Sequence, residues 1–274
     1  MAEPLLEVDG VSVRFGGIVA LDHVSFAVEQ GSICGLIGPN GAGKTTLIDA
    51  ITGFVRHTGR VELDGQDVGA LAPFQIAQRG CARTWQGTDL FDDLDVRENL
   101  AVATGRAGST RPPSGGPGGS GPGGGGPGGG GEPDVDATLR LLGLDPIAEA
   151  MPAELSEGQR KLVGLARAMA GRPRLLCLDE PGAGLDTRES EALGERLREL
   201  ADQGQSTLLI DHDMGLVLGI CDRVVVLEFG RVIANDAPDV VRGDGAVIAA
   251  YLGGGAAAAA AAGDPAAQPQ GERT

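Results

Sequence analysis

Residues 38–45 read Gly38-Pro39-Asn40-Gly41-Ala42-Gly43-Lys44-Thr45, and this stretch decides the fold of the chain. It fits the pattern G-x-x-x-x-G-K-[S/T], a glycine-rich loop whose backbone N–H groups turn inward around phosphate groups. The context agrees, because the apolar run 32–37 before it predicts a buried strand and residues 43–51 predict a helix. A helix N-terminus favours an anion, so the sequence predicts a nucleotide site here.

The residue types in this loop suit ATP and Mg²⁺ as cofactors. The glycines leave the backbone open where a Cβ would obstruct the phosphates. Lys44 can reach the β- and γ-phosphates, and the hydroxyl of Thr45 can ligate Mg²⁺. We therefore predict that the nucleotide is held by Gly38, Pro39, Asn40, Gly41, Ala42, Gly43, Lys44, Thr45 and Thr46. The alternative is a chance match, which is less credible because Lys44 is one of two lysines in the chain.

A second element carries two carboxylates. The apolar run 175–178 predicts a buried strand, and Asp179 and Glu180 follow at its C-terminal end. Beside a phosphate loop, Asp179 is placed to hold Mg²⁺ and Glu180 to polarise the water that attacks the γ-phosphate. Taken alone, the same residues would indicate only a buried strand that ends in a solvated acidic turn.

The order of the elements predicts an α/β fold. Residues 5–13 and 24–28 alternate apolar and polar side chains around Gly16-Gly17 and predict antiparallel strands. Farther along the chain, strands alternate with helices, which predicts a mostly parallel sheet covered on both faces. The expected strands are 61–63, 175–178, 207–210 and 223–227, and the expected helices are 95–102, 136–142, 158–170 and 188–201.

Two segments have a strongly biased composition. Residues 105–133 are almost entirely Gly, Pro and Ser, and residues 253–274 form an Ala/Gly/Pro tail. Neither segment can bury enough apolar surface to offset the entropy of ordering it. We therefore expect both segments to be disordered.

The overall composition argues against several classes of protein. Asp+Glu 38 against Lys+Arg 22 gives a formal charge of −16, which is unsuited to the basic face of a nucleic-acid binder. The N-terminus shows no secretory signal, and no segment approaches the roughly 18 apolar residues that span a bilayer. Cys34, Cys81, Cys177 and Cys221 form no C-x-x-C pair, and three of them lie in apolar surroundings that suit buried thiols. We expect a soluble, cytoplasmic protein that reaches a membrane only through a partner.

A third motif makes the sequence recognisable. Leu155-Ser156-Glu157-Gly158-Gln159 resembles the LSGGQ signature of the ATP-binding-cassette (ABC) ATPases. By itself the stretch could be an ordinary helix start, with Ser156 and Gln159 forming a capping box, and that structure is compatible with the signature role. Other family elements follow in the expected order: Gln86 resembles the Q-loop glutamine, 183–186 the D-loop, and His212 the switch histidine.

The resemblance implies an ABC ATPase domain over about residues 5–252. This fold has a P-loop NTPase core with a mostly parallel sheet, an antiparallel β subdomain and an α-helical subdomain. The helical subdomain would cover about 87–165, interrupted by 105–133. Two such cassettes bind two ATP molecules between them, head to tail. The family pattern places Ser156, Gly158, Gln159 and Asp186 among the nucleotide-binding residues.

The resemblance also assigns catalytic roles. It implies catalysis by Glu180, His212, Lys44 and Gln86, and Mg²⁺ binding by Thr45, Gln86 and Asp179. Phe15 stands where the family places the aromatic residue that stacks on adenine, although it could equally belong to the core. Trp85 is expected to pack rather than to act.

Finer features resemble the ATPases of branched-chain amino-acid importers (the LivG type). Residues 80–86 are similar to that group's G-I-A-R-T-F-Q stretch, with Cys81 and Trp85 substituted. Residues 13–17, 210–214 and 247–253 also resemble that group, although Asp211 stands where the group usually has Glu. The resemblance implies a subunit on the cytoplasmic face of the cell membrane. Its partners would be integral-membrane permease subunits, a second ABC ATPase (identical or different) and, indirectly, an extracytoplasmic solute-binding protein.

Several alternatives stay open at this point. Very similar ATPases serve urea and other small polar solutes. A soluble cassette acting on nucleic acid or ribosomes would need a second cassette, a coiled-coil insertion or a basic surface, and none is apparent in the sequence. A nucleotide-binding regulator without turnover is disfavoured because both Asp179 and Glu180 are present.

Overall fold

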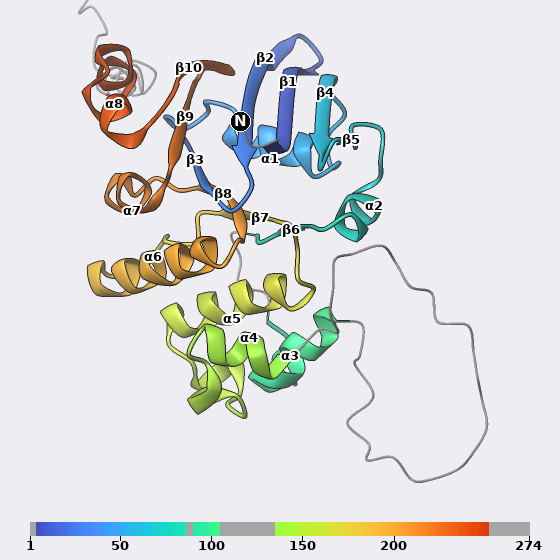
Figure 1. Ribbon diagram of the computed structural model, residues 1–274, viewed down its shortest axis with the longest axis vertical. Coiled ribbons are helices and arrows are strands. Elements are labelled where there is room, and N and C mark those ends of the chain that lie inside the picture. The colour runs from blue at the N-terminus through green and yellow to red at the C-terminus, as the bar shows by residue number, and fades with distance from the viewer. Residues whose placement is uncertain (1–3, 86–89, 105–134, 252–274) are drawn as a thin grey trace, which may run out of the picture.

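The computed structural model describes residues 4–85, 90–104 and 135–251. Figure 1 shows two sheets in the upper part of the molecule and a group of helices beneath them. The predictions for Gln86, for the insert 105–133 and for the tail 253–274 lie outside the described residues.

An antiparallel sheet forms the N-terminal part. Its strand order is β2-β1-β4-β5. The predicted alternation is present, but the strands extend beyond the predicted ranges at both ends because backbone pairing continues past the apolar residues. The strands are β1 (Pro4–Phe15), β2 (Ile18–Glu29), β4 (Thr58–Leu63) and β5 (Gln66–Asp67).

A second sheet has the order β10-β9-β3-β8-β7-β6. Every neighbouring pair from β9 to β6 is parallel, and β10 runs antiparallel to β9. The prediction of a mostly parallel sheet is thereby confirmed. Its strands are β3 (Ile33–Ile37), β6 (Cys81–Arg83), β7 (Leu175–Asp179), β8 (Ser206–Ile210), β9 (Arg223–Glu228) and β10 (Arg231–Asp236).

Helices cover both faces of this second sheet, with α1 on one face and α5 and α6 on the other. The sequence predicts α1, α3, α4, α5 and α6, but it does not predict α2, α7 or α8. Helix α7 has an identifiable start, because the Asp213 carboxylate accepts the N–H groups of Gly215 and Leu216. The helices are α1 (Lys44–Ile51), α2 (Pro73–Gln78), α3 (Val96–Ala103), α4 (Val135–Leu141), α5 (Glu157–Ala170), α6 (Thr187–Asp202), α7 (Met214–Ile220) and α8 (Pro238–Gly243).

The parallel sheet separates two hydrophobic cores. Cys34 and Leu36 of β3 face the core that contains α1 and the antiparallel sheet. Ile33 and Ile37, which point the other way, face the core that contains α3 to α6. Strands buried on both faces must be apolar throughout, which explains the continuous hydrophobic runs in the sequence.

All four cysteines are free and buried. The prediction of buried thiols, which covered three of the four, is confirmed, and the fourth cysteine is buried as well. Burial raises the pKa of Cys34 to about 12, so this thiol stays protonated at neutral pH.

The parallel pairing places several loops along one edge. Strands β3, β6, β7 and β8 all run in the same direction, so the residues after Ile37, Arg83, Asp179 and Ile210 emerge on the same side of the sheet. Ligand sites of open α/β sheets lie at this carboxyl edge. The fold therefore gathers segments that are far apart in sequence, such as those after Ile37 and Ile210, around one region.

We predict that Leu36→Ala destabilises the protein by about 2–5 kcal/mol, because it removes a fully buried side chain from the central strand. The control is Ile18→Ala, since Ile18 is 72% exposed and its truncation should change stability by no more than about 0.5 kcal/mol. Denaturant unfolding measures both values. Equal effects of the two substitutions would contradict the described position of β3.

Candidate nucleotide site

The predicted phosphate loop connects β3 to α1 at the carboxyl edge. Two of its glycines are required by their surroundings. Gly38 has φ 150, and an added Cβ would lie 2.1 Å from the carbonyl oxygen of Leu227. Gly43 has φ 105, and its Cβ would lie 2.8 Å from the carbonyl oxygen of Ala20. No side chain caps α1, and the first N–H groups of a helix lack partners within it, so they are available to an anion.

Lys44 stands at the start of α1 and folds over the loop. Its Nζ donates hydrogen bonds to the carbonyl oxygens of Gly38 (2.6 Å) and Pro39 (3.1 Å). Burial lowers the pKa of Lys44, and the carboxylates of Glu180 and Asp179 act against that shift. The structure thus brings the loop lysine into the electrostatic field of the two predicted acidic residues.

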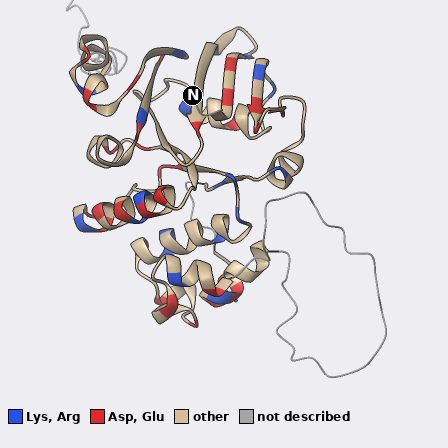
Figure 2. Ribbon diagram, viewed as in Figure 1, with Lys and Arg blue, Asp and Glu red and all other residues tan. Residues whose placement is uncertain are grey.

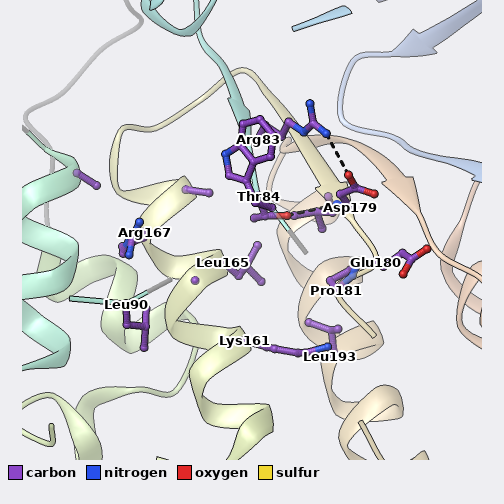
Figure 3. A pocket seen from close by; sticks show the side chains of 15 residues that line it. Arg83, Thr84, Leu90, Lys161, Leu165, Arg167, Asp179, Glu180, Pro181 and Leu193 are labelled. Carbon is purple, nitrogen blue, oxygen red and sulfur yellow. Dashed lines mark hydrogen bonds and ion pairs between the residues drawn. The ribbon is translucent and has the colours of Figure 1, made fainter. Parts of the chain in front are cut away.

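Asp179 and Glu180 lie at the end of β7. The Asp179 side chain is only 4% exposed, and it forms an ion pair with Arg83 at 3.1 Å. Glu180 has φ 51, a left-handed conformation that is strained for a residue with a side chain, and its N–H donates to the carbonyl oxygen of Ile210 at 2.7 Å. In Figure 3 the Glu180 carboxylate points away from the Arg83–Asp179 pair. Such strain is typical of functional positions.

The residues at this edge fit a magnesium ion. The Thr45 hydroxyl and the Asp179 carboxylate are hard oxygen donors, which Mg²⁺ prefers. Among the residues that the structure describes, no three His, Cys, Asp or Glu side chains gather as a metal cluster. Water and phosphate oxygens would therefore complete the coordination shell, as is usual for Mg²⁺ bound with a nucleotide.

The predicted signature residues form the N-terminus of α5. Ser156 and Gln159 make a reciprocal capping box: the Ser156 Oγ accepts from the Gln159 N–H at 3.2 Å, and the Gln159 Oε1 accepts from the Ser156 N–H at 2.8 Å. Gly158 packs against α6, where an added Cβ would lie 2.7 Å from Glu189 Oε1. Because α5 and α1 pack on opposite faces of the parallel sheet, the signature is separated from the phosphate loop of its own chain.

Asp186 occupies a similar position at α6. Its carboxylate accepts the Glu189 N–H at 2.9 Å and so caps the helix. The local fold thus explains Asp186 without a ligand, and nucleotide contact by this residue stays a prediction.

His212 follows β8 and is largely exposed, whereas its neighbour Asp211 is almost fully buried. One oxygen of Asp211 accepts the N–H groups of His212 (2.7 Å) and Asp213 (3.0 Å). The other accepts the N–H of Gly182 at 2.8 Å. Asp211 therefore ties the histidine loop to the segment that follows Glu180, a role that the sequence did not indicate.

Two predicted site residues remain, Phe15 and Gln86. Phe15 is the last residue of β1 and is 52% exposed, so the alternative that it belongs to the core is wrong. Adenine stacking by Phe15 stays a prediction. Gln86 lies outside the described residues.

Tyr251 is a further residue at the loop. It lies in a helical segment, 245–251, and its side chain hydrogen-bonds to the backbone of Gly38. Burial raises the pKa of Tyr251, and the Gly38 hydrogen bond opposes the shift. The sequence had marked 247–253 only by resemblance, without a role.

Comparison with known proteins supplies the family. The family described as "ABC transporter" matches residues 21–183. This chain belongs to the ABC transporter family. Over 262 residues it is 38% identical to the high-affinity branched-chain amino acid transport ATP-binding protein BraF of Pseudomonas aeruginosa, covering 92% of this chain and 99% of that relative. It is 40% identical over 256 residues to the LivG protein of Escherichia coli, with the same coverage.

Solved structures agree with this membership. The ADP conformation of MJ1267, an ATP-binding cassette of an ABC transporter, superimposes with a TM-score of 0.76 at 29% identity, covering 92% of this chain and 100% of that one. A nucleotide-free ATP-binding cassette superimposes with a TM-score of 0.75 at 28% identity, covering 91% and 99%. The ABC ATPase fold predicted from the motifs is thus confirmed, and the cassette binds nucleotide and hydrolyses ATP.

We predict that Asp211→Asn lowers both stability and ATP turnover. An amide cannot accept all three N–H groups, and its NH₂ must face at least one of them, which costs about 1–3 kcal/mol. Denaturant unfolding and steady-state ATPase assays measure the two effects. Asp211→Glu serves as the control because it keeps the charge and both acceptors. Wild-type stability of the Asn variant would contradict the described role of Asp211.

Proposed function

We propose that this chain is the ATP-hydrolysing subunit of an importer for branched-chain amino acids. The observation that carries the proposal is its 38–40% identity, over 92% of its length, to relatives whose names state branched-chain amino acid transport. The geometry supports the ATP-hydrolysing part of the proposal, because the phosphate loop and the Asp179–Glu180 pair meet at one edge of the sheet. Substrate choice would lie with the solute-binding protein and the permeases.

In this proposal the predicted residues act around the γ-phosphate. The loop 38–46 holds the phosphates, and Lys44 neutralises their charge. Glu180 is the general base for the attacking water, and His212 and Gln86 help to position the water and the γ-phosphate. Thr45, Asp179 and Gln86 would hold Mg²⁺, which when bound offsets the charge that develops during phosphoryl transfer.

The position of the signature supports a head-to-tail pair of cassettes. Ser156 is exposed at the start of α5, on the opposite face of the sheet from α1. In this position Ser156 is better placed to contact an ATP bound to a second cassette than the ATP on its own phosphate loop. In the pair, Ser156, Gly158 and Gln159 of one cassette would contact the ATP on the loop of the other, and Asp186 would lie at the junction. The second cassette can be another copy or a different ATPase.

The proposed location is the cytoplasmic face of the cell membrane, through permease subunits. Among the residues that the structure describes, none of the helices combines the length and the apolar character that a membrane crossing requires. In Figure 2 basic positions alternate with acidic ones along α6 instead of gathering into a basic band. This distribution and the charge of −16 give no support to nucleic acid as a partner.

We predict that Glu180→Gln keeps ATP binding but lowers kcat by about 10²–10⁴-fold, the usual contribution of a general base. The amide preserves shape but cannot take the proton of the attacking water. Steady-state turnover and the retention of ATP by a stable dimer measure the two properties. Lys44→Ala is the contrast, since it should weaken nucleotide binding itself. Full turnover by Glu180→Gln would assign the base elsewhere.

We predict that cells carrying Glu180→Gln lose uptake of labelled leucine, and that unlabelled isoleucine and valine compete with uptake in cells carrying the wild-type protein. The measurement requires confirmed expression and a strain without another leucine importer. Unlabelled urea is the matched competitor that should have no effect. Unchanged leucine uptake in the variant would refute branched-chain import while leaving the ATPase assignment intact.

A further inference from the structure

Arg83, the last residue of β6, joins two carboxylates that belong to different elements. Its Nη1 lies 2.5 Å from Asp49 Oδ1, and its Nη2 lies 3.1 Å from Asp179 Oδ2. The Arg83 side chain is 5% exposed, Asp179 is 4% exposed and Asp49 is 24% exposed. Buried charges require partners of this kind, and the planar guanidinium can serve two carboxylates at once. The sequence pattern predicts no role for Arg83.

An aromatic pair fixes the guanidinium from one face. The Arg83 Cζ lies 4.2 Å from the centroid of the Trp85 ring. Trp85 in turn meets Phe54 edge to face, with the ring centroids 5.1 Å apart and an interplanar angle of 83°. This stacking leaves the guanidinium little freedom to rotate away from its two carboxylates. Although Trp85 is half exposed, it packs as expected.

The arrangement connects the three elements that build the nucleotide site. Asp49 belongs to α1, the helix that begins at the phosphate loop, and Asp179 ends β7. Between them, the Thr84 N–H donates to the carbonyl oxygen of Cys177 at 2.9 Å, and the Thr84 Oγ1 accepts the Asp179 N–H at 3.3 Å. The Arg83–Thr84 dipeptide thus contacts both the main chain and the side chain of Asp179.

The Asp179 carboxylate is therefore held in one orientation. Arg83 engages Oδ2, and no hydrogen bond or ion pair with any described residue engages Oδ1. Arg83, Asp179 and Glu180 line a cavity of about 280 Å³ beside α5, and Figure 3 shows the ion pair at the edge of that cavity. One oxygen is used for positioning, and the other is left for a cation or for its water.

We propose that Arg83 is a positioning residue for the magnesium site, which it serves by orienting Asp179. The inference rests on the magnesium site proposed above. Outer partners that orient a metal-binding carboxylate typically contribute about 10–100-fold to metal affinity. The hydrogen bonds and ion pairs of the Arg83 side chain go to Asp49, Thr52 and Asp179 and not to the phosphate loop 38–45, so a change at Arg83 should affect the metal-dependent part of ATP binding more than the metal-independent part.

The test compares Arg83→Met, Arg83→Lys and a control, Arg174→Met, in the full chain. Arg174 forms an exposed ion pair with Asp64 away from the site. Binding of a fluorescent ATP analogue is measured in EDTA and then as a function of Mg²⁺. We expect Arg83→Met to lose little affinity in EDTA but to need about 10–100-fold more Mg²⁺ for half-maximal enhancement. Arg83→Lys keeps the positive charge but lacks the planar guanidinium, so its Mg²⁺ requirement should lie between those of wild type and Arg83→Met. Arg174→Met should have the Mg²⁺ requirement of wild type.

Trp85 supplies a second readout that does not depend on nucleotide. It is the single tryptophan of the chain, so the tryptophan fluorescence of the purified protein reports on the surroundings of this ring, which include the Arg83 guanidinium. Arg83→Met should change the emission and the quenching of Trp85 by acrylamide, and Arg174→Met should not. If Arg83→Met fails to fold, as judged by circular dichroism, the Mg²⁺ requirement and the Trp85 fluorescence of Arg83→Lys are compared with those of wild type instead.

Asp179→Asn separates failure of this inference from failure of the magnesium site. If Mg²⁺ enhances binding to wild type and to Asp179→Asn equally, the proposed magnesium site is wrong. If Asp179→Asn loses the enhancement while both Arg83 variants keep the wild-type Mg²⁺ requirement, the role of Arg83 is wrong and the site stands. Equal loss of ATP affinity with and without Mg²⁺ in the Arg83 variants would make Arg83 purely structural and would also overturn the proposal.

Discussion

The parallel pairing of β3, β8 and β7 is the constraint on which the rest of the site depends. Asp179 is opposite Ile210 across β7 and β8, and Leu36 is opposite Ile210 across β3 and β8, so the three strands end together. Side chains alternate between the two faces, and a shift of one residue would send every side chain of a strand to the wrong core. The hydrophobic pattern of the strands therefore fixes where the polar groups beyond them emerge.

The phosphate loop is also supported by backbone hydrogen bonds from outside β3 and α1. The turn between β9 and β10 contacts it, because the Gly230 N–H donates to the carbonyl oxygen of Ala42 at 2.9 Å. Asp22 of β2 donates its N–H to the carbonyl oxygen of Gly230, which joins the antiparallel sheet to the same point. The loop is thus supported from both sheets before any ligand binds. Because the backbone N–H groups of the loop are already held in place, binding an anion costs little conformational entropy and little reorganisation energy.

Local patterns were enough to predict the phosphate loop, the Asp179–Glu180 pair, the mostly parallel sheet and the capping box at Ser156. These features depend on residues a few positions apart. Asp211 and Arg83 could not be found in this way, because their partners Gly182 and Asp179 are 29 and 96 residues away in sequence. Phe15 was ambiguous for a related reason: an aromatic residue at a strand end is apolar in either setting, and only its exposure shows that it is outside the core.

Because the chain is acidic overall, binding of the anionic nucleotide depends on a small number of cationic groups close to the site. A formal charge of −16 repels an anionic nucleotide at long range, although salt limits this repulsion to a Debye length of about 8 Å. Binding must then be decided by groups within that distance, and Lys44 is one of only two lysines in the chain. Asp179 and Glu180 add negative charge at the same place. A metal ion that neutralises these carboxylates together with the phosphates removes both conflicts, so the acidic site favours the metal complex of the nucleotide over the free anion.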